Sequence, residues 1–131
     1  DLIEYTLEML EQLPAEVQLY MITNGLKSVQ RPRIANSAIK GYFSGVIISE
    51  EVGFAKPDKE IFDIAFEIMD QPRKHEVMIV GDSLSSDIAG GMNFGIDTCW
   101  FNPNSVVNNN GFKPTYTIKH LAQLNGIINN S

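Results

Sequence analysis

The stretch EVMIVGDSLSSD, residues 76–87, decides the fold class of this 131-residue chain. Residues 76–80 form a short apolar run, which is typical of a strand buried on both faces of a parallel sheet. Gly81 and Asp82 end the run, and residues 83–93 have the pattern of a helix. Asp82 is therefore expected at the end of a strand, and Asp87 in the first turn of the next helix.

The same alternation of strand-like and helical segments continues on both sides of this stretch. It predicts an α/β fold, a parallel sheet with helices on both faces. Right-handed crossovers bring the carboxyl ends of all strands to one edge, where open α/β sheets bind their ligands. Strands are expected over 17–23, 45–49, 76–80 and 96–101, a loop over 102–114, and helices over 6–13, 28–39, 57–69, 83–93 and 118–128.

Composition excludes several classes of protein. With 44% hydrophobic and 20% charged residues the chain fits one globular domain, and its net charge of −6 argues against nucleic acid and anionic membranes as partners. No apolar run approaches the roughly 18 residues of a membrane span. The single cysteine, Cys99, excludes an internal disulfide. No signal peptide is visible, so a cytoplasmic location is expected. Because the chain opens at Asp1, we expect a piece of a longer protein.

Polar residues follow three of the expected strands. Thr23-Asn24-Gly25 forms a turn whose N–H groups could bind an anion, although an ordinary strand-to-helix turn has the same pattern. Lys56 precedes a proline at a helix start and could neutralise a phosphate, or simply be solvated. Asp82 and Asp87 suit Mg²⁺, which needs only one or two protein carboxylates, while an acid in a first helical turn also stabilises the helix without any metal.

Taken together and in this order, these groups resemble the haloacid dehalogenase-like hydrolase superfamily, which has a Rossmann-like fold. Three of its motifs are matched by ITNG (22–25), ISEEVGFAKP (48–57) and VGDSLSSD (80–87). GGMNFG (90–95) and TCW (98–100) are similar to the branch that contains pyrimidine 5′-nucleotidases. The resemblance covers nearly the whole chain.

The resemblance implies how a phosphoryl group would be bound. Thr23 would donate a hydrogen bond to a phosphoryl oxygen, helped by the N–H groups of Asn24 and Gly25. Lys56 would neutralise both the phosphoryl group and the attacking nucleophile. The substrate would be a small phosphorylated metabolite, with nucleotides as one class.

The resemblance also implies a Mg²⁺ cofactor. Asp82 would bind the ion directly. Asp87 would bind a water molecule coordinated to the ion, or would steer Lys56. Both functions depend on carboxylates meeting at the carboxyl edge of the sheet.

The first motif of the family, Asp-x-Asp, is absent. In the family its first aspartate attacks phosphorus to form an aspartyl-phosphate, and its second acts as acid and base. No two aspartates of this chain are two residues apart. We therefore expect residues 1–131 to be the C-terminal part of a haloacid dehalogenase-like core domain that lacks the N-terminal central strand and the cap, and we expect this chain alone to be inactive.

In the family the missing strand lies between the strands that here end at Thr23 and Asp82. Its absence would leave two apolar strand edges unpaired, so we expect either that the remaining strands close the gap or that another chain fills it, for example by self-association. A catalytically dead relative that binds phosphate or a protein, a phosphoglycolate phosphatase and a phosphomutase remain alternatives. A receiver domain has its Lys-Pro after its acids, the opposite order to this chain.

Overall fold

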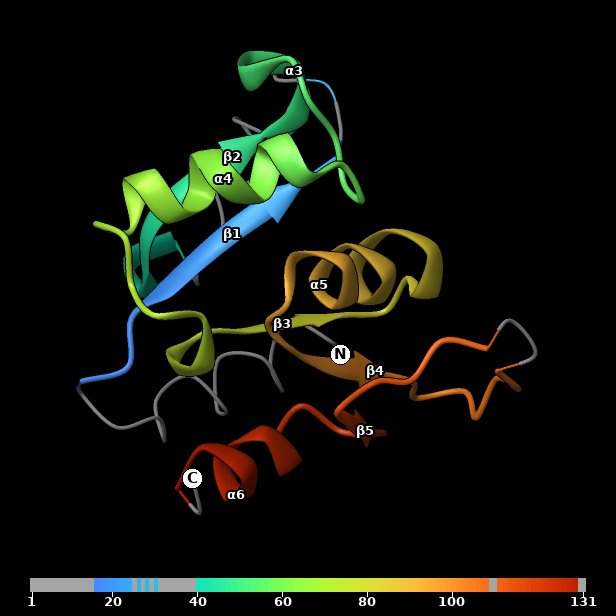
Figure 1. The fold of residues 1–131 in the computed structure, drawn as a ribbon. Helices are drawn as coiled ribbons and strands as arrows, with labels where there is room; N and C mark the ends of the chain where they lie inside the picture. Colours follow the sequence, from blue (N-terminus) through green and yellow to red (C-terminus); the bar gives the residue numbers. More distant parts are fainter. Residues whose placement is uncertain are drawn as a thin grey trace.

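The computed structural model describes residues 16–24, 26, 28, 30, 40–108 and 111–129. Within this part of the chain, the strands form two parallel sheets, of order β1-β2 and β3-β4-β5, and helices pack against them (Figure 1). Gly25, the predicted helix over 6–13 and nearly all of the one over 28–39 lie outside the described residues.

The strands are β1 (Leu19–Thr23), β2 (Phe43–Ile48), β3 (Met78–Gly81), β4 (Asp97–Phe101) and β5 (Tyr116–Ile118). The helices and helical turns are η1 (Lys40–Tyr42), α3 (Ser49–Val52), α4 (Lys59–Ile68), η2 (Lys74–Glu76), η3 (Leu84–Ile88), α5 (Ala89–Phe94) and α6 (Gln123–Asn129).

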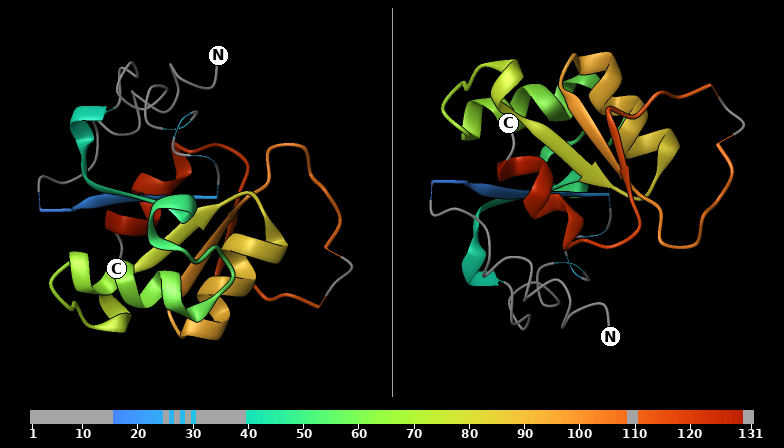
Figure 2. Two further views of the ribbon diagram at one scale, coloured as in Figure 1. Left: turned by 90° about the horizontal axis from the view of Figure 1, so that it is seen from above. Right: turned by 90° about the horizontal axis from the view of Figure 1, so that it is seen from below.

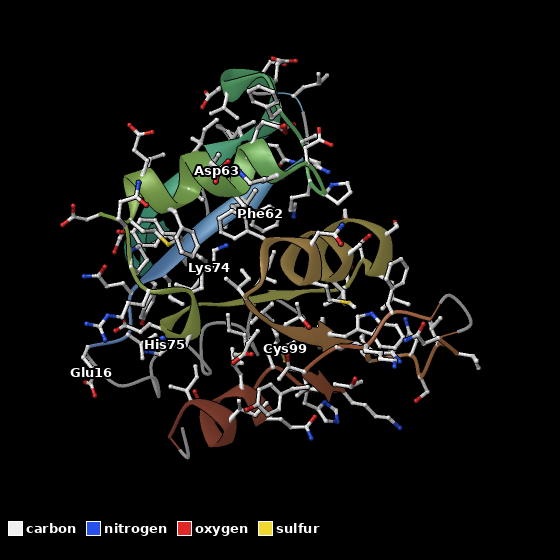
Figure 3. The ribbon with its side chains drawn as sticks, in the orientation of Figure 1. Glu16, Phe62, Asp63, Lys74, His75 and Cys99 are labelled. Atoms are coloured by element: carbon white, nitrogen blue, oxygen red, sulfur yellow. The ribbon has the colours of Figure 1, made fainter. Side chains whose placement is uncertain are left out.

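The helix α4 covers one face of the structure. Its apolar residues recur at helical spacing and are buried on one side of the helix: Ile61, Phe62, Ala65 and Phe66. Phe62 lies between α4 and α5 (Figure 3). Its ring stacks on that of Phe94 from α5, with the ring centroids 5.5 Å apart. This contact joins α4, which lies between β2 and β3 in the sequence, to α5, which lies between β3 and β4.

The opposite face is covered by α6, as the two views of Figure 2 show. Leu124 of this helix is buried against Cys99 of β4 and Ile118 of β5. The sheets therefore carry helices on both faces, and the predicted α/β fold with a Rossmann-like parallel arrangement is confirmed. Within the described ranges, no helix combines the length and apolar character that a transmembrane segment requires.

Two predicted helix starts are wrong. The helix expected from Pro57 begins at Lys59, because residues 55–58 form a turn in which the Asp58 N–H donates to the Ala55 carbonyl (2.8 Å). The helix expected over 118–128 begins only at Gln123, because residues 116–118 form the strand β5 beside β4. The predicted loop therefore leads into a strand that the local pattern did not show.

A cavity of about 750 Å³ separates the two sheets. It is lined by β1 and β3, which do not pair with each other, by Phe62 and Phe66 of α4, and by Leu124 of α6. Its lining also includes Lys56 and Asp87. The described strands thus do not close the gap expected between the strands ending at Thr23 and Asp82. That another chain fills the gap stays a prediction.

Burial makes Cys99 an unreactive thiol. The residue is fully buried on β4, and loss of solvation of the thiolate raises its pKa from the ordinary 9.0 to about 11. We expect no reaction with a thiol reagent in the folded chain and full reaction in urea. Because the unfolded thiol ionises first, the free energy of unfolding should fall as the pH rises from about 9 to about 11. A Cys99→Ser variant provides the control, since it should lack this fall.

Candidate functional site

The site residues expected from the sequence lie where β1 and β3 end and in the turn before α4. Thr23 is the last residue of β1 and Asn24 follows it. Lys56 lies in the turn between α3 and α4, Asp82 directly follows β3, and Asp87 lies in η3. The structure brings Asn24, Lys56 and Asp87 together through direct contacts, whereas Gly25 lies outside the described residues.

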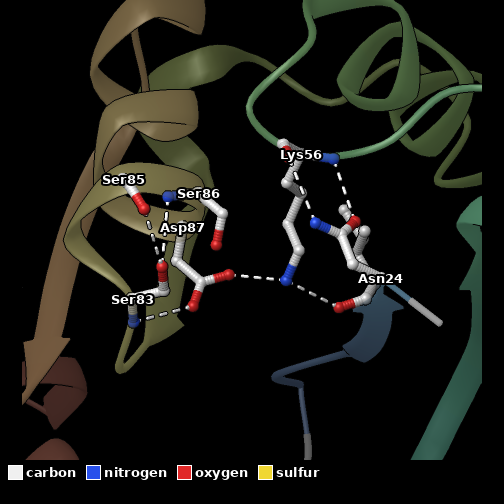
Figure 4. Close-up of polar contacts among 7 residues, drawn as sticks. Asn24, Lys56, Ser83, Ser85, Ser86 and Asp87 are labelled. Atoms are coloured by element: carbon white, nitrogen blue, oxygen red, sulfur yellow. Dashed lines mark hydrogen bonds and ion pairs between the residues drawn. The ribbon is translucent and has the colours of Figure 1, made fainter.

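An ion pair between Lys56 and Asp87 forms the centre of the site (Figure 4). Lys56 Nζ lies 2.5 Å from Asp87 Oδ1, and the two side chains are only 11% and 8% exposed. Lys56 Nζ also donates to the backbone carbonyl of Ile22 in β1, at 3.0 Å. The ammonium is therefore held between β1 and the turn η3 that follows β3, and is not simply solvated.

Asn24 holds the backbone of the same lysine. Its amide Nδ2 donates to the Lys56 carbonyl at 3.1 Å, and its Oδ1 accepts from the Lys56 N–H at 3.0 Å. These two bonds join positions 32 residues apart in the sequence. The turn after β1 and the turn before α4 are thus fixed to each other.

Asp87 is oriented by the loop that precedes it. Its second oxygen, Oδ2, accepts from the Ser83 N–H at 3.2 Å, and the Ser83 hydroxyl accepts from the Ser86 N–H at 3.2 Å. The helix predicted over 83–93 begins with the π-type turn η3, in which the Ser83 carbonyl accepts from the Asp87 and Ile88 N–H groups. This wider turn brings the Asp87 carboxylate back over the end of β3.

Gly81 makes room for that carboxylate. A Cβ at this position would overlap Oδ2 and Cγ of Asp87 and lie 2.6 Å from its Cβ. The local sequence pattern of Gly81 predicts only the end of a strand. A glycine that ends a buried strand six residues before an acid is the signal that could have indicated this packing.

Asp82 offers an exposed carboxylate at the end of β3. Its backbone carbonyl accepts from Trp100 Nε1 at 3.0 Å, which holds the residue against β4. Among the described residues, the Asp82 carboxylate and the Thr23 hydroxyl form no hydrogen bond with one another or with other side chains. The Asp82 side chain is exposed to solvent at this edge, and Thr23 is half-buried.

The described residues fit Mg²⁺ only in part. Asp82 supplies a hard carboxylate oxygen of the kind the ion prefers, but both oxygens of Asp87 are engaged by Lys56 and Ser83. No group of three His, Cys, Asp or Glu side chains in the described ranges could enclose a metal ion. A complete site would need further oxygen ligands from water or from outside this chain.

Comparison with known proteins gives consistent matches. The sequence model of the haloacid dehalogenase-like hydrolases matches residues 1–95. The candidate HAD-hydrolase YfnB of Bacillus subtilis is 38% identical over 128 residues, which are 98% of this chain and 54% of YfnB. The pyrimidine 5′-nucleotidase YjjG of Escherichia coli is 38% identical over 120 residues, 92% of this chain and 53% of YjjG.

A solved structure also matches the fold of this chain closely. The magnesium-bound crystal structure of Bacillus subtilis YfnB superposes with a TM-score of 0.91 at 37% identity, over 96% of this chain and 55% of that one. The chain spans about half the length of the curated relatives it matches. Because the family model covers well over half of the chain, and a relative at 38% identity aligns with nearly all of it, the chain belongs to the haloacid dehalogenase-like hydrolases.

Proposed function

We propose that residues 1–131 form the C-terminal part of the core domain of a Mg²⁺-dependent phosphomonoesterase that acts on small phosphorylated metabolites such as nucleoside 5′-monophosphates. The observation that carries this proposal is the ammonium of Lys56, held between Ile22 and Asp87 at the sheet edge where Thr23 ends β1. A cation fixed against Ile22, the residue that precedes Thr23 in the sequence, suits a phosphoryl dianion. The nucleotide class is supported by the name of YjjG, a pyrimidine 5′-nucleotidase.

The residues of this chain would bind and stabilise the phosphoryl group. The Thr23 hydroxyl and the N–H groups of Asn24 and Gly25 would donate to its equatorial oxygens. Lys56 would compensate the negative charge that the group and its attacking nucleophile bring together. Asp87 would keep the ammonium in place, because its carboxylate contacts Nζ directly. Preorganised donors and charges of this kind supply much of the stabilisation of a transition state.

The remaining chemistry would come from outside residues 1–131. When bound, Mg²⁺ supplies positive charge to the phosphoryl oxygens, and Asp82 would contribute one ligand to it. The aspartate that forms the aspartyl-phosphate has no counterpart here, since the chain contains no Asp-x-Asp. Its place would be beside Lys56 and Asp87, where the cavity between β1 and β3 reaches the site.

Hydrolysis of phosphate esters tests this proposal. We expect the 131-residue chain with Mg²⁺ to leave p-nitrophenyl phosphate and pyrimidine and purine nucleoside 5′-monophosphates intact, because it lacks the nucleophile. We expect the longer protein that includes the preceding segment to hydrolyse them, and to stop when EDTA removes the metal. Released phosphate is the measurement. Robust turnover by the 131-residue chain, or a longer protein inactive on every phosphomonoester, would contradict the proposal.

A further inference from the structure

We propose that the side chain of Asn24 is a positioning residue that sets the place of the Lys56 ammonium through the Lys56 backbone. Its importance for catalysis rests on the proposed function. The positioning itself does not, because it can be measured on the chain without substrate. Asn24 thereby has a second function besides the phosphate contact expected of its N–H group.

The geometry identifies Lys56 as the target of this amide. Asn24 uses both polar atoms of its side chain on one residue, donating to the Lys56 carbonyl at 3.1 Å and accepting from the Lys56 N–H at 3.0 Å (Figure 4). A paired arrangement of this kind restrains both position and orientation of the peptide, which a single bond would not. Both polar atoms of the Asn24 side chain are thus engaged within the chain.

Lys56 needs such restraint because its side chain is long and flexible. Its Nζ must reach the Ile22 carbonyl at 3.0 Å and the Asp87 carboxylate at once. Ile22 lies in β1 and Asp87 lies in η3, which follows β3 of the other sheet, so a shift of the lysine backbone would break at least one contact. Fixing the backbone therefore fixes the ammonium between the two sheets.

The two hydrogen bonds from the Asn24 side chain to the Lys56 backbone, here called the Asn24 clamp, also couple the two halves of the proposed phosphate site. Asn24 directly follows Thr23, so its backbone belongs to the turn expected to bind phosphoryl oxygens. Its side chain holds the loop that carries the cation. The spacing between the N–H donors and the ammonium is thus set by one residue, which preorganises the site.

The chain offers a matched control in Asn102. Its Nδ2 donates to the Val106 carbonyl at 3.0 Å, and its Oδ1 accepts from the Val106 N–H at 2.9 Å. An Asn102→Ala variant loses the same pair of bonds as Asn24→Ala, but in the loop after β4. General destabilisation should affect both variants, whereas release of Lys56 should occur only in the first.

Two measurements on the 131-residue chain test the positioning. In Asn24→Ala, amide exchange of the Lys56 N–H should become about threefold to tenfold faster, because its acceptor is lost. Labelling of the Lys56 amine by trinitrobenzenesulfonate, followed by peptide mass spectrometry, should accelerate to a similar extent. Lys59, 71% exposed in its native ion pair, is the internal reference and should not change.

Asn24→Asp keeps the proposal testable if the alanine variant does not fold. Its carboxylate can still accept from the Lys56 N–H but can no longer donate to the carbonyl. We expect exchange close to that of the unchanged chain together with faster amine labelling. Unchanged exchange and labelling in Asn24→Ala, or equal acceleration at Lys56 and Lys59 in both alanine variants, would overturn the proposal.

The catalytic consequence is tested in the longer protein with p-nitrophenyl phosphate. A displaced ammonium should lower kcat more than it raises KM, whereas Asn102→Ala should leave both close to the unchanged enzyme. If the longer protein shows no phosphatase activity, the proposed function fails while the labelling result still decides the positioning. A normal kcat in an Asn24→Ala enzyme whose Lys56 labels faster would overturn the catalytic part of the inference.

Discussion

Replacing Lys56 by methionine in the longer protein should lower kcat for p-nitrophenyl phosphate by about a hundredfold to a thousandfold. The change removes the ammonium but keeps an unbranched side chain of similar length. The cation can no longer compensate the charge of the phosphoryl group and the nucleophile. The substitution also leaves the 8%-exposed Asp87 carboxylate without its ion-pair partner. We therefore expect the free energy of unfolding to fall by about 3–5 kcal/mol.

Lys59→Met is the matched control for this change. Lys59 lies three residues further along, at the start of α4, and pairs with Asp63 on the surface, where the two side chains are 71% and 49% exposed. Exposed pairs of this kind contribute little to stability. We expect activity and stability to stay close to those of the unchanged protein. Equal turnover in the Lys56 and Lys59 variants would show that Lys56 does not stabilise the reaction.

The second large effect is expected from Gly81→Ala. The added methyl group would occupy the space of Oδ2 and Cγ of Asp87, and Asp87 Cβ lies only 2.6 Å from its position. Asp87 must then move off the end of β3 and lose its contacts with Ser83 and Lys56. We expect the free energy of unfolding, measured by urea titration, to fall by about 1–3 kcal/mol. Labelling of the released Lys56 amine should accelerate as well.

Gly126→Ala separates this effect from the general consequence of replacing a glycine. Gly126 lies within α6, and a Cβ there would have no heavy atom within 4 Å. Alanine favours the helix, so we expect unchanged or slightly increased stability. If Gly81→Ala has the stability and the Lys56 labelling rate of Gly126→Ala, the close packing of Gly81 against Asp87 is not important.

The strands were predictable from local sequence because each buried strand is a short apolar run. The last residues of β3 and β4 lie within one residue of the ends expected from the sequence, 80 and 101. The strand β5 was missed because two of its residues, Tyr116 and Thr117, are exposed and leave no apolar run. It forms through pairing with β4, next to the reciprocal bonds between Thr98 and Thr115.

The residues of the site were predictable by type and order, but their contacts were not. Lys56 and Asp87 are 31 residues apart, and the carbonyl of Ile22 carries no signal in the sequence. The sequence predicts a function for the backbone N–H of Asn24 and none for its side-chain amide. The ion pair, the Asn24 clamp and the close approach of Gly81 to Asp87 all join segments that meet only in the folded chain.

The order of the motifs by itself determined the family and the α/β class, because apolar periodicity and strand-end residues are properties of short segments. Tertiary structure alone decided that the two sheets stay apart around a cavity and that one lysine links them. Those features depend on which strand edges find partners and on distances between remote residues. A linear pattern of residues does not encode such distances until the chain has packed.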